Sequence, residues 1–247
     1  MDRRQFLLAG TALGFSGFAY AGKNFGGLLG AAKKGAEAAS LNDDQVRQYG
    51  AQMARYYDSH SRIAPPGSPY GKRLAVLTRG LDNDNGLALN YKVYLTPEVN
   101  AHVTPDGSVR LYGGLMDMMS DDELRFVIGH EIGHVAHEHQ RKRLQTALAA
   151  GAAQDIAASS GNDKVAIIAD GPLGDLVVKV ITAKHSQGNE KEADDYGLAF
   201  MARKKYDRKA AVSALDKLAA MSSGKAQWLS THPDPKQRAD RMRKQVA

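Results

Sequence analysis

Residues 120–139 read SDDELRFVIGHEIGHVAHEH and carry the clearest structural signal in the chain. Ser120 is followed three residues later by Glu123, which is the capping-box pattern that marks the start of a helix. Apolar residues at helical spacing come next, so the segment predicts a helix over residues 121–144. Inside this helix, four histidines and two glutamates fall within the thirteen residues from Val127 to His139.

His130 and His134 are four residues apart, so on a helix both rings project from one face. Two imidazoles at this spacing can bind one zinc ion. Glu131 is rotated by about 100° from His130 and can reach a water instead, and zinc lowers the pKa of a water that it binds to ~7. The pattern favours a zinc site with Glu131 as general base. A solvated histidine-rich face, which His137 and His139 would suit, is the alternative.

A third zinc ligand must come from elsewhere in the chain. The segment NEKEADDYG, residues 189–197, places Glu190 and Asp194 four apart on a predicted helix. Glu190 can complete a site of two histidines and one glutamate that keeps an open position for water. Asp194 is then placed to accept a hydrogen bond from the other nitrogen of a ligand histidine. An acidic, solvated helix face explains the same residues, and spacing alone leaves both interpretations open.

The amino-acid composition excludes some kinds of site and of binding partner. The chain has 247 residues, a formal net charge of +6 and no cysteine. Disulfides and thiolate metal sites are therefore excluded. The basic residues are scattered and no aromatic residues alternate with them, so we expect no nucleic-acid partner. A solvated basic surface that tolerates contact with anionic lipid headgroups fits this charge better.

The N-terminal residues have the pattern of an export signal. Arg3 and Arg4 precede a mildly apolar stretch, and Ala19-Tyr20-Ala21 has the small-x-small form of a cleavage site. We predict a signal over 1–21, by the twin-arginine or the Sec route, a Gly- and Ala-rich linker over 22–41 and a single domain over 42–247. The apolar run is shorter than the ~20 residues that span a bilayer, so no integral span is expected after signal removal.

The rest of the domain predicts helices around a small sheet. Alternating residues and a TPDG turn at 104–107 indicate an antiparallel sheet over residues 88–113. Helices are expected over 43–57 with Asn42 as N-cap, and after Ser68. Others are expected in four C-terminal stretches: an Ala-rich helix ending near 160, one from 172 to 206 with a break near Gly188, a shorter one from 207 and a final basic helix. The fold class is therefore α+β and mainly helical.

Four segments in this order resemble one family: VNAHVTPDGSVRLYGGLM (99–116), DELRFVIGHEIGHVAHEH (122–139), SQGNEKEADDYG (186–197) and STHPDPKQRADRM (230–242). They are similar to the HtpX, BepA and LoiP group of zinc metallopeptidases, which includes the CAAX prenyl endopeptidases. The resemblance covers about residues 42–241. It implies a zincin-like domain in which the H-E-x-x-H helix carries the active site.

The resemblance also implies residue roles. His130, His134 and Glu190 would bind one Zn²⁺ per chain, Glu131 would act as general base, and Asp194 would support a ligand histidine. The resemblance places His232 near the metal, as an oxyanion stabiliser or as a ligand that closes the open position; a plain turn histidine is the alternative. It also implies that Asn100 and Ala101 lie on an edge strand that binds the substrate backbone.

The resulting expectation is a compact, exported endopeptidase of the periplasm that cleaves unfolded or misassembled proteins in protein quality control. We expect neither the helical-repeat domain of BepA nor the membrane spans of HtpX. It has Ser186-Gln187 where the family often has Ser-Arg, so no role is assigned to that arginine. Two rivals are a zinc-binding, chaperone-like module with a blocked site and a metal hydrolase acting on something other than peptides.

Overall fold

The computed structural model describes residues 41–155, 179–221 and 228–247. Most of the described chain is helical, as expected. The named helices are α3 (Asp43–Ser59), α4 (Pro69–Leu77), α5 (Gly113–Met118), α6 (Asp121–Ala136), α7 (His139–Asp155), α9 (Gln187–Arg203), α10 (Lys209–Ala219), α11 (Trp228–Thr231) and α12 (Pro235–Val246). The named strands are β1 (Asn83–Asp84), β2 (Leu87–Ala88), β3 (Asn90–Tyr94), β4 (Ala101–Val103) and β5 (Ser108–Tyr112).

The three-stranded sheet is mixed, whereas the sequence predicted an antiparallel one. The turn at 104–107 does join β4 and β5 as an antiparallel pair, with Ala101 opposite Leu111. However, β3 pairs with β5 in parallel, and the strand order is β3-β5-β4. After β3, the chain skips one strand position before it forms β4. The turn after β4 then places β5 in the skipped position, antiparallel to β4 and therefore parallel to β3. As a result, β5 is central and wholly buried, and β4 lies at an edge.

Helix starts follow the predicted capping residues. The Asn42 side chain accepts from the backbone of Gln45, and the Ser120 hydroxyl accepts from Glu123, each within a capping box. Ser68 caps α4, with Pro69 at its first turn. These caps satisfy N–H groups that have no partner inside the helix. Because each cap depends only on residues within one turn, the sequence predicted these starts correctly.

Helix α6 is shorter than predicted. It ends at Ala136 instead of continuing to residue 144, because Glu138 adopts a left-handed conformation with φ of 57°. A new helix, α7, then begins at His139. Near residue 188 the predicted break is present but falls earlier, at 183–186, where Ser186 caps α9.

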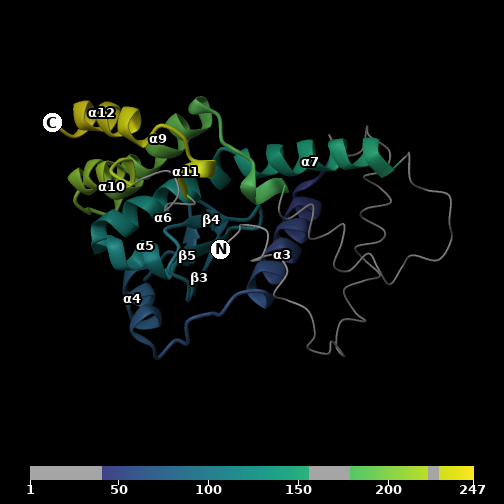
Figure 1. The fold of residues 1–247 in the computed structure, drawn as a ribbon, viewed down its shortest axis with the longest axis horizontal. Coiled ribbons are helices and arrows are strands. Elements are labelled where there is room, and N and C mark those ends of the chain that lie inside the picture. Colours follow the sequence, from purple (N-terminus) through teal and green to yellow (C-terminus); the bar gives the residue numbers. More distant parts are fainter. Residues whose placement is uncertain (1–40, 156–178, 222–227) are drawn as a thin grey trace.

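Glycines bring α6 and α9 into close contact, and this contact positions the site. A Cβ atom built on Gly133 would lie 3.0 Å from the Cα of Ala193, and one on Gly129 would lie 2.7 Å from a ring atom of Phe200. The two helices can therefore approach closely. Figure 1 shows α6, α9, α10 and α12 grouped beside the sheet, while α7 extends away from that group near α3.

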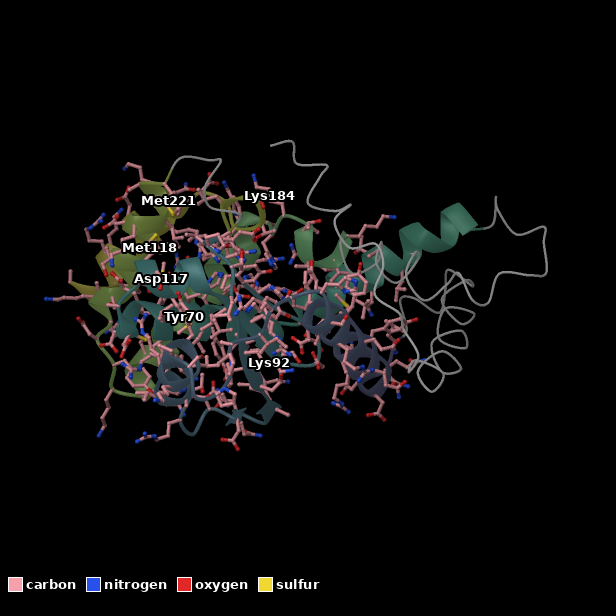
Figure 2. The ribbon with its side chains drawn as sticks, turned by 60° about the horizontal axis from the view of Figure 1, so that its bottom comes forward. Tyr70, Lys92, Asp117, Met118, Lys184 and Met221 are labelled. Atoms are coloured by element: carbon pink, nitrogen blue, oxygen red, sulfur yellow. The ribbon has the colours of Figure 1, made fainter. Side chains whose placement is uncertain are left out.

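The apolar core has two parts. The larger one joins the sheet to α4, α5, α6, α9, α10 and α12, and a smaller one joins α3 and α7 to Val180 and Ile181. At the surface of the larger part, the Tyr70 hydroxyl of α4 donates to Asp117 Oδ1 of α5 at 2.9 Å. Both residues are labelled in Figure 2. Among the described residues, no helix combines the length and apolar character needed to cross a bilayer.

Some predictions fall outside the described residues. These are the export signal at 1–21, the linker at 22–41 apart from its last residue, the end of the Ala-rich helix beyond 155 and the start of the helix predicted from 172.

Candidate metal centre

Helices α6 and α9 bring the two histidines and the predicted third ligand together. His130 Nε2 and His134 Nε2 are 3.0 Å apart. Glu190 Oε1 lies 3.4 Å from His134 Nε2, and its Oε2 lies 3.7 Å from His130 Nε2. All three residues are at most 1 % exposed. The interpretation of these residues as solvated polar helix faces is therefore wrong.

His232 joins this cluster from the loop between α11 and α12. Its Nδ1 lies 3.0 Å from Glu190 Oε1 and 3.3 Å from His130 Nε2. Its ring stacks on Trp228 with centroids 4.4 Å apart and an interplanar angle of 14°. The stack holds the imidazole in place, so His232 is not a plain turn histidine.

These four side chains fit a zinc ion. One donor atom from each of His130, His134, Glu190 and His232 lies within 4.8 Å of all the others. Neighbouring donors around a tetrahedral zinc with bonds of ~2.0 Å are separated by roughly 3.3 Å, close to the spacings in this cluster. Burial lowers the pKa of His134 well below its ordinary value, which favours the neutral ring that binds metals.

Asp194 and Arg238 support the ligands from behind. Asp194 Oδ1 lies 3.1 Å from His130 Nδ1, so an Nδ1–H donor there leaves Nε2 free for a metal. Arg238 donates to both oxygens of Asp194 and also forms an ion pair with Glu190. Burial disfavours the charged Asp194 carboxylate, but Arg238 and the bond from His130 outweigh burial and lower the pKa of Asp194 to about 2.

Glu131 lies next to the cluster but is not part of it. Its side chain is buried, and its Oε1 has no hydrogen-bond partner in the structure. That oxygen lies 3.6 Å from His232 Nε2. A buried carboxylate oxygen without a donor is costly, and such groups occur where a side chain acts in catalysis or binds a water or an ion.

Strand β4 is a buried edge strand in which alternate residues turn their backbone groups away from β5. The Asn100 carbonyl accepts from Tyr112, and the Thr104 N–H donates to Ser108, so even-numbered residues bond to β5. The backbone groups of Ala101 and Val103 then point away from the sheet. The Ala101 N–H is bonded to the side-chain oxygen of Asn100 at 2.9 Å.

The segment that precedes β4 is linked to the helix next to His232. The Trp228 N–H donates to the Val99 carbonyl at 3.3 Å, and the His232 N–H donates to the Trp228 carbonyl at 2.9 Å. The segment just before β4 is therefore joined to α11, the helix that precedes His232, by a backbone hydrogen bond.

Sequence reasoning missed several residues around the site. Arg238 lies inside a segment that resembled the family, yet its contact with two carboxylates was not foreseen because it sits in a generally basic helix. His139 contacts the back of His134, and Glu192 contacts His139. His185 stacks on His134 with centroids 3.8 Å apart. No local spacing marked these contacts.

Comparison with known proteins gives the same result as the geometry. Residues 79–246 match the model of peptidase family M48. The chain belongs to peptidase family M48. Its sequence is 38% identical over 223 residues to Metalloprotease LoiP of Escherichia coli (strain K12), covering 90% of this chain and 88% of the relative. It is 37% identical over 214 residues to Metalloprotease YcaL of the same strain, covering 85% and 84%.

A more distant relative is a putative beta-barrel assembly-enhancing protease of Vibrio cholerae. It is 32% identical over 212 residues, which cover 81% of this chain but 43% of the relative. Family membership and the intact cluster of histidines and glutamate together identify the chain as an M48 metalloprotease. The predicted family, the mainly helical α+β class and the peptidase activity class are confirmed.

Proposed function

We propose that this M48 metalloprotease is a zinc-dependent endopeptidase of the periplasm that cleaves unfolded or misassembled proteins. The observation that carries the proposal is the convergence of His130, His134 and Glu190 beside the unpartnered carboxylate oxygen of Glu131. Two neutral imidazoles and one carboxylate are the donor set of catalytic zinc sites. We propose one Zn²⁺ per chain, held by these three residues.

The proposed mechanism assigns a proton-transfer role to Glu131. When bound, zinc polarises the scissile carbonyl and makes water a stronger acid. Glu131 accepts the proton of the attacking water through its free oxygen and later returns it to the leaving amine. Asp194 and Arg238 keep the His130 ring oriented and the negative charge of Glu190 balanced.

His232 is proposed as the second catalytic side chain. Its Nε2 faces Glu131 at 3.6 Å, and its ring is fixed by Trp228. A donor held beside the general base is placed to stabilise the negative charge that develops on the carbonyl oxygen.

We propose that the substrate adds a strand to β4. The outward-facing backbone of Ala101 and Val103 offers the pattern of donors and acceptors that an extended peptide needs. The side-chain oxygen of Asn100 occupies the Ala101 N–H, so it must give way when a peptide pairs there. A folded protein presents few free extended segments, which supports unfolded chains as substrates. An extended backbone also suits a peptide better than another class of substrate.

Export is proposed from the sequence pattern of residues 1–21, which would deliver the domain at 42–247 to the periplasm after cleavage. The basic surface is compatible with peripheral contact at anionic membranes. No membrane-crossing segment is required by this proposal.

The alternative is a zinc-binding, chaperone-like module whose site is blocked. It rests on His232, because structural zinc sites usually have four protein ligands, and His232 supplies a fourth donor here. Glu131 favours the peptidase, since a permanently closed site would have no use for a buried carboxylate oxygen that accepts no hydrogen bond.

The decisive experiment compares Glu131→Gln with Glu138→Gln. Glu131→Gln keeps the size of the side chain but cannot accept a proton. We expect it to bind one zinc and to lose casein hydrolysis by at least ~100-fold. Glu138 is exposed on the same segment, so Glu138→Gln should match the wild type. Comparable hydrolysis by Glu131→Gln would exclude the assigned base.

The cellular substrate class has its own test. New protein N-termini in the exported fraction should appear in cells with the wild-type protein and be absent with Glu131→Gln. Cleavage sites confined to well-folded surface loops would contradict the preference for unfolded chains.

A further inference from the structure

The break after α6 returns the chain to the back of the metal cluster. In a continuous helix, residue 139 would be rotated by about 140° from residue 134 and would face elsewhere. Instead, Glu138 is left-handed, and α7 starts in a new direction at His139. His139 is 1 % exposed, and its Nδ1 lies 3.0 Å from His134 Nδ1.

A carboxylate from α9 contacts the other side of the same ring. Glu192 Oε2 lies 2.8 Å from His139 Nε2. Glu192 follows Glu190 by two residues, and its side chain is 56 % exposed. One helix therefore supplies a carboxylate to the metal cluster and another to the residue behind the cluster.

The contacts from Glu192 through a neutral His139 to His134 allow one consistent arrangement of protons. An ionised carboxylate only accepts, so His139 must carry its proton on Nε2 and donate it to Glu192. The Nδ1 of a neutral His139 is then an acceptor, and it requires a proton on His134 Nδ1. That proton leaves the His134 Nε2 lone pair directed toward the other donors of the cluster.

We propose that Glu192 and His139 form a relay that sets the tautomer and orientation of His134. His139 and Glu192 are positioning residues, and they act on zinc only through His134. The two ligand histidines would thus be supported differently. Asp194 and Arg238 hold His130 in a buried environment, whereas the relay behind His134 ends in a partly exposed carboxylate. This inference rests on the proposed ligation of zinc by His134.

Substitutions at Glu192 test the relay without disturbing the core. Glu192→Lys replaces the acceptor with a donor and reverses the preferred tautomer of His139. We expect its zinc affinity to fall about 10–100-fold, the usual effect of losing a residue that orients a ligand. Glu192→Gln retains an acceptor oxygen and should lose less. Asp44→Lys makes the same charge change on α3, where Asp44 forms an exposed ion pair with Arg47, and should bind zinc as the wild type does.

His139→Leu should weaken zinc binding by a similar factor, and thermal unfolding of the metal-free protein will show whether it still folds. If His139→Leu does not fold, the Glu192 variants still test the relay, because the Glu192 side chain is largely exposed. Zinc affinity is measured by competition with a chelator on the full chain, independently of proteolysis.

Nitrogen-15 spectra of histidine-labelled protein read the tautomers directly. With zinc bound, His139 should be protonated at Nε2 and unprotonated at Nδ1. An unprotonated Nε2, or a Glu192→Lys variant with wild-type zinc affinity, overturns the relay. Failure of the wild-type protein itself to bind zinc would instead overturn the proposed function, so the two failures are distinguishable.

Discussion

Arg238 and Asp194 form a buried, bidentate ion pair. The Arg238 Nε and Nη2 groups donate to the two oxygens of Asp194 at 2.9 and 2.7 Å, and both residues are at most 6 % exposed. The guanidinium also contacts Glu190. One arginine on the C-terminal helix therefore balances the charges of two α9 carboxylates that belong to the metal site.

Removing that arginine should destabilise the protein strongly. Arg238→Leu leaves two buried carboxylates without a counter-charge, and breaking a buried pair typically costs about 3–5 kcal/mol. We expect a large decrease in the urea midpoint of the metal-free protein. Arg243→Leu on the same helix removes an exposed cation and should change the midpoint little. Equal changes of the urea midpoint in the two variants would mean that the buried ion pair contributes no more to stability than the exposed arginine does.

Gly133→Ala tests the close contact of α6 with α9. The added methyl group would lie 3.0 Å from Ala193 Cα, so the helices must separate slightly. Overpacking of this kind costs about 1–3 kcal/mol. Zinc binding should weaken too, because α9 carries Glu190. Gly67→Ala, where no atom lies within 4 Å of the new Cβ, is the control. A fully stable Gly133→Ala protein with normal zinc affinity would contradict this account of the packing.

His102 should make the protein less stable in acid. Burial, reinforced by the charge of Arg110, lowers the pKa of His102 to about 3 from an ordinary 6.5. Between these pH values the unfolded chain binds a proton that the folded chain does not, so stability falls as pH decreases, by up to about 1.4 kcal/mol per pH unit.

His102→Phe removes this titration and keeps an aromatic ring beside Tyr112. With a chelator present to keep both proteins free of metal, the free energy of unfolding of this variant should therefore depend less on pH between 7 and 4 than that of the wild type. His60→Phe alters an exposed histidine and is the matched comparison. Parallel pH profiles for His102→Phe and the wild type would show that the buried ring is not the source.

His232→Phe separates the two roles open to that residue. Phenylalanine preserves the stacking on Trp228 and removes both nitrogens. We expect zinc to be retained by the other three ligands and kcat to decrease about 100-fold or more, as for the loss of an oxyanion donor. The measurements are zinc stoichiometry and steady-state hydrolysis of an unfolded substrate. An increase in kcat would instead identify His232 as a ligand that closes the site.

The sequence alone determined the features that depend on near neighbours. The N-cap at Asn42 and the capping box at Ser120 were predicted correctly because their partners lie three residues away. The same holds for the pairing of His130 with His134, since one helical turn fixes their spacing. Glu190 was identified as a candidate by spacing and by resemblance, but spacing alone could not distinguish a ligand from a solvated acid.

Only the tertiary structure decided the rest. The placement of β5 between β3 and β4 made the sheet mixed, and no alternation pattern within a strand specifies its neighbours. The packing of α12 places Arg238 at the site. The left-handed conformation of Glu138 ends the continuous helix that local propensity favoured, and it places His139 behind His134. These contacts join residues far apart in sequence or across a break, so their energies arise only once the core has packed.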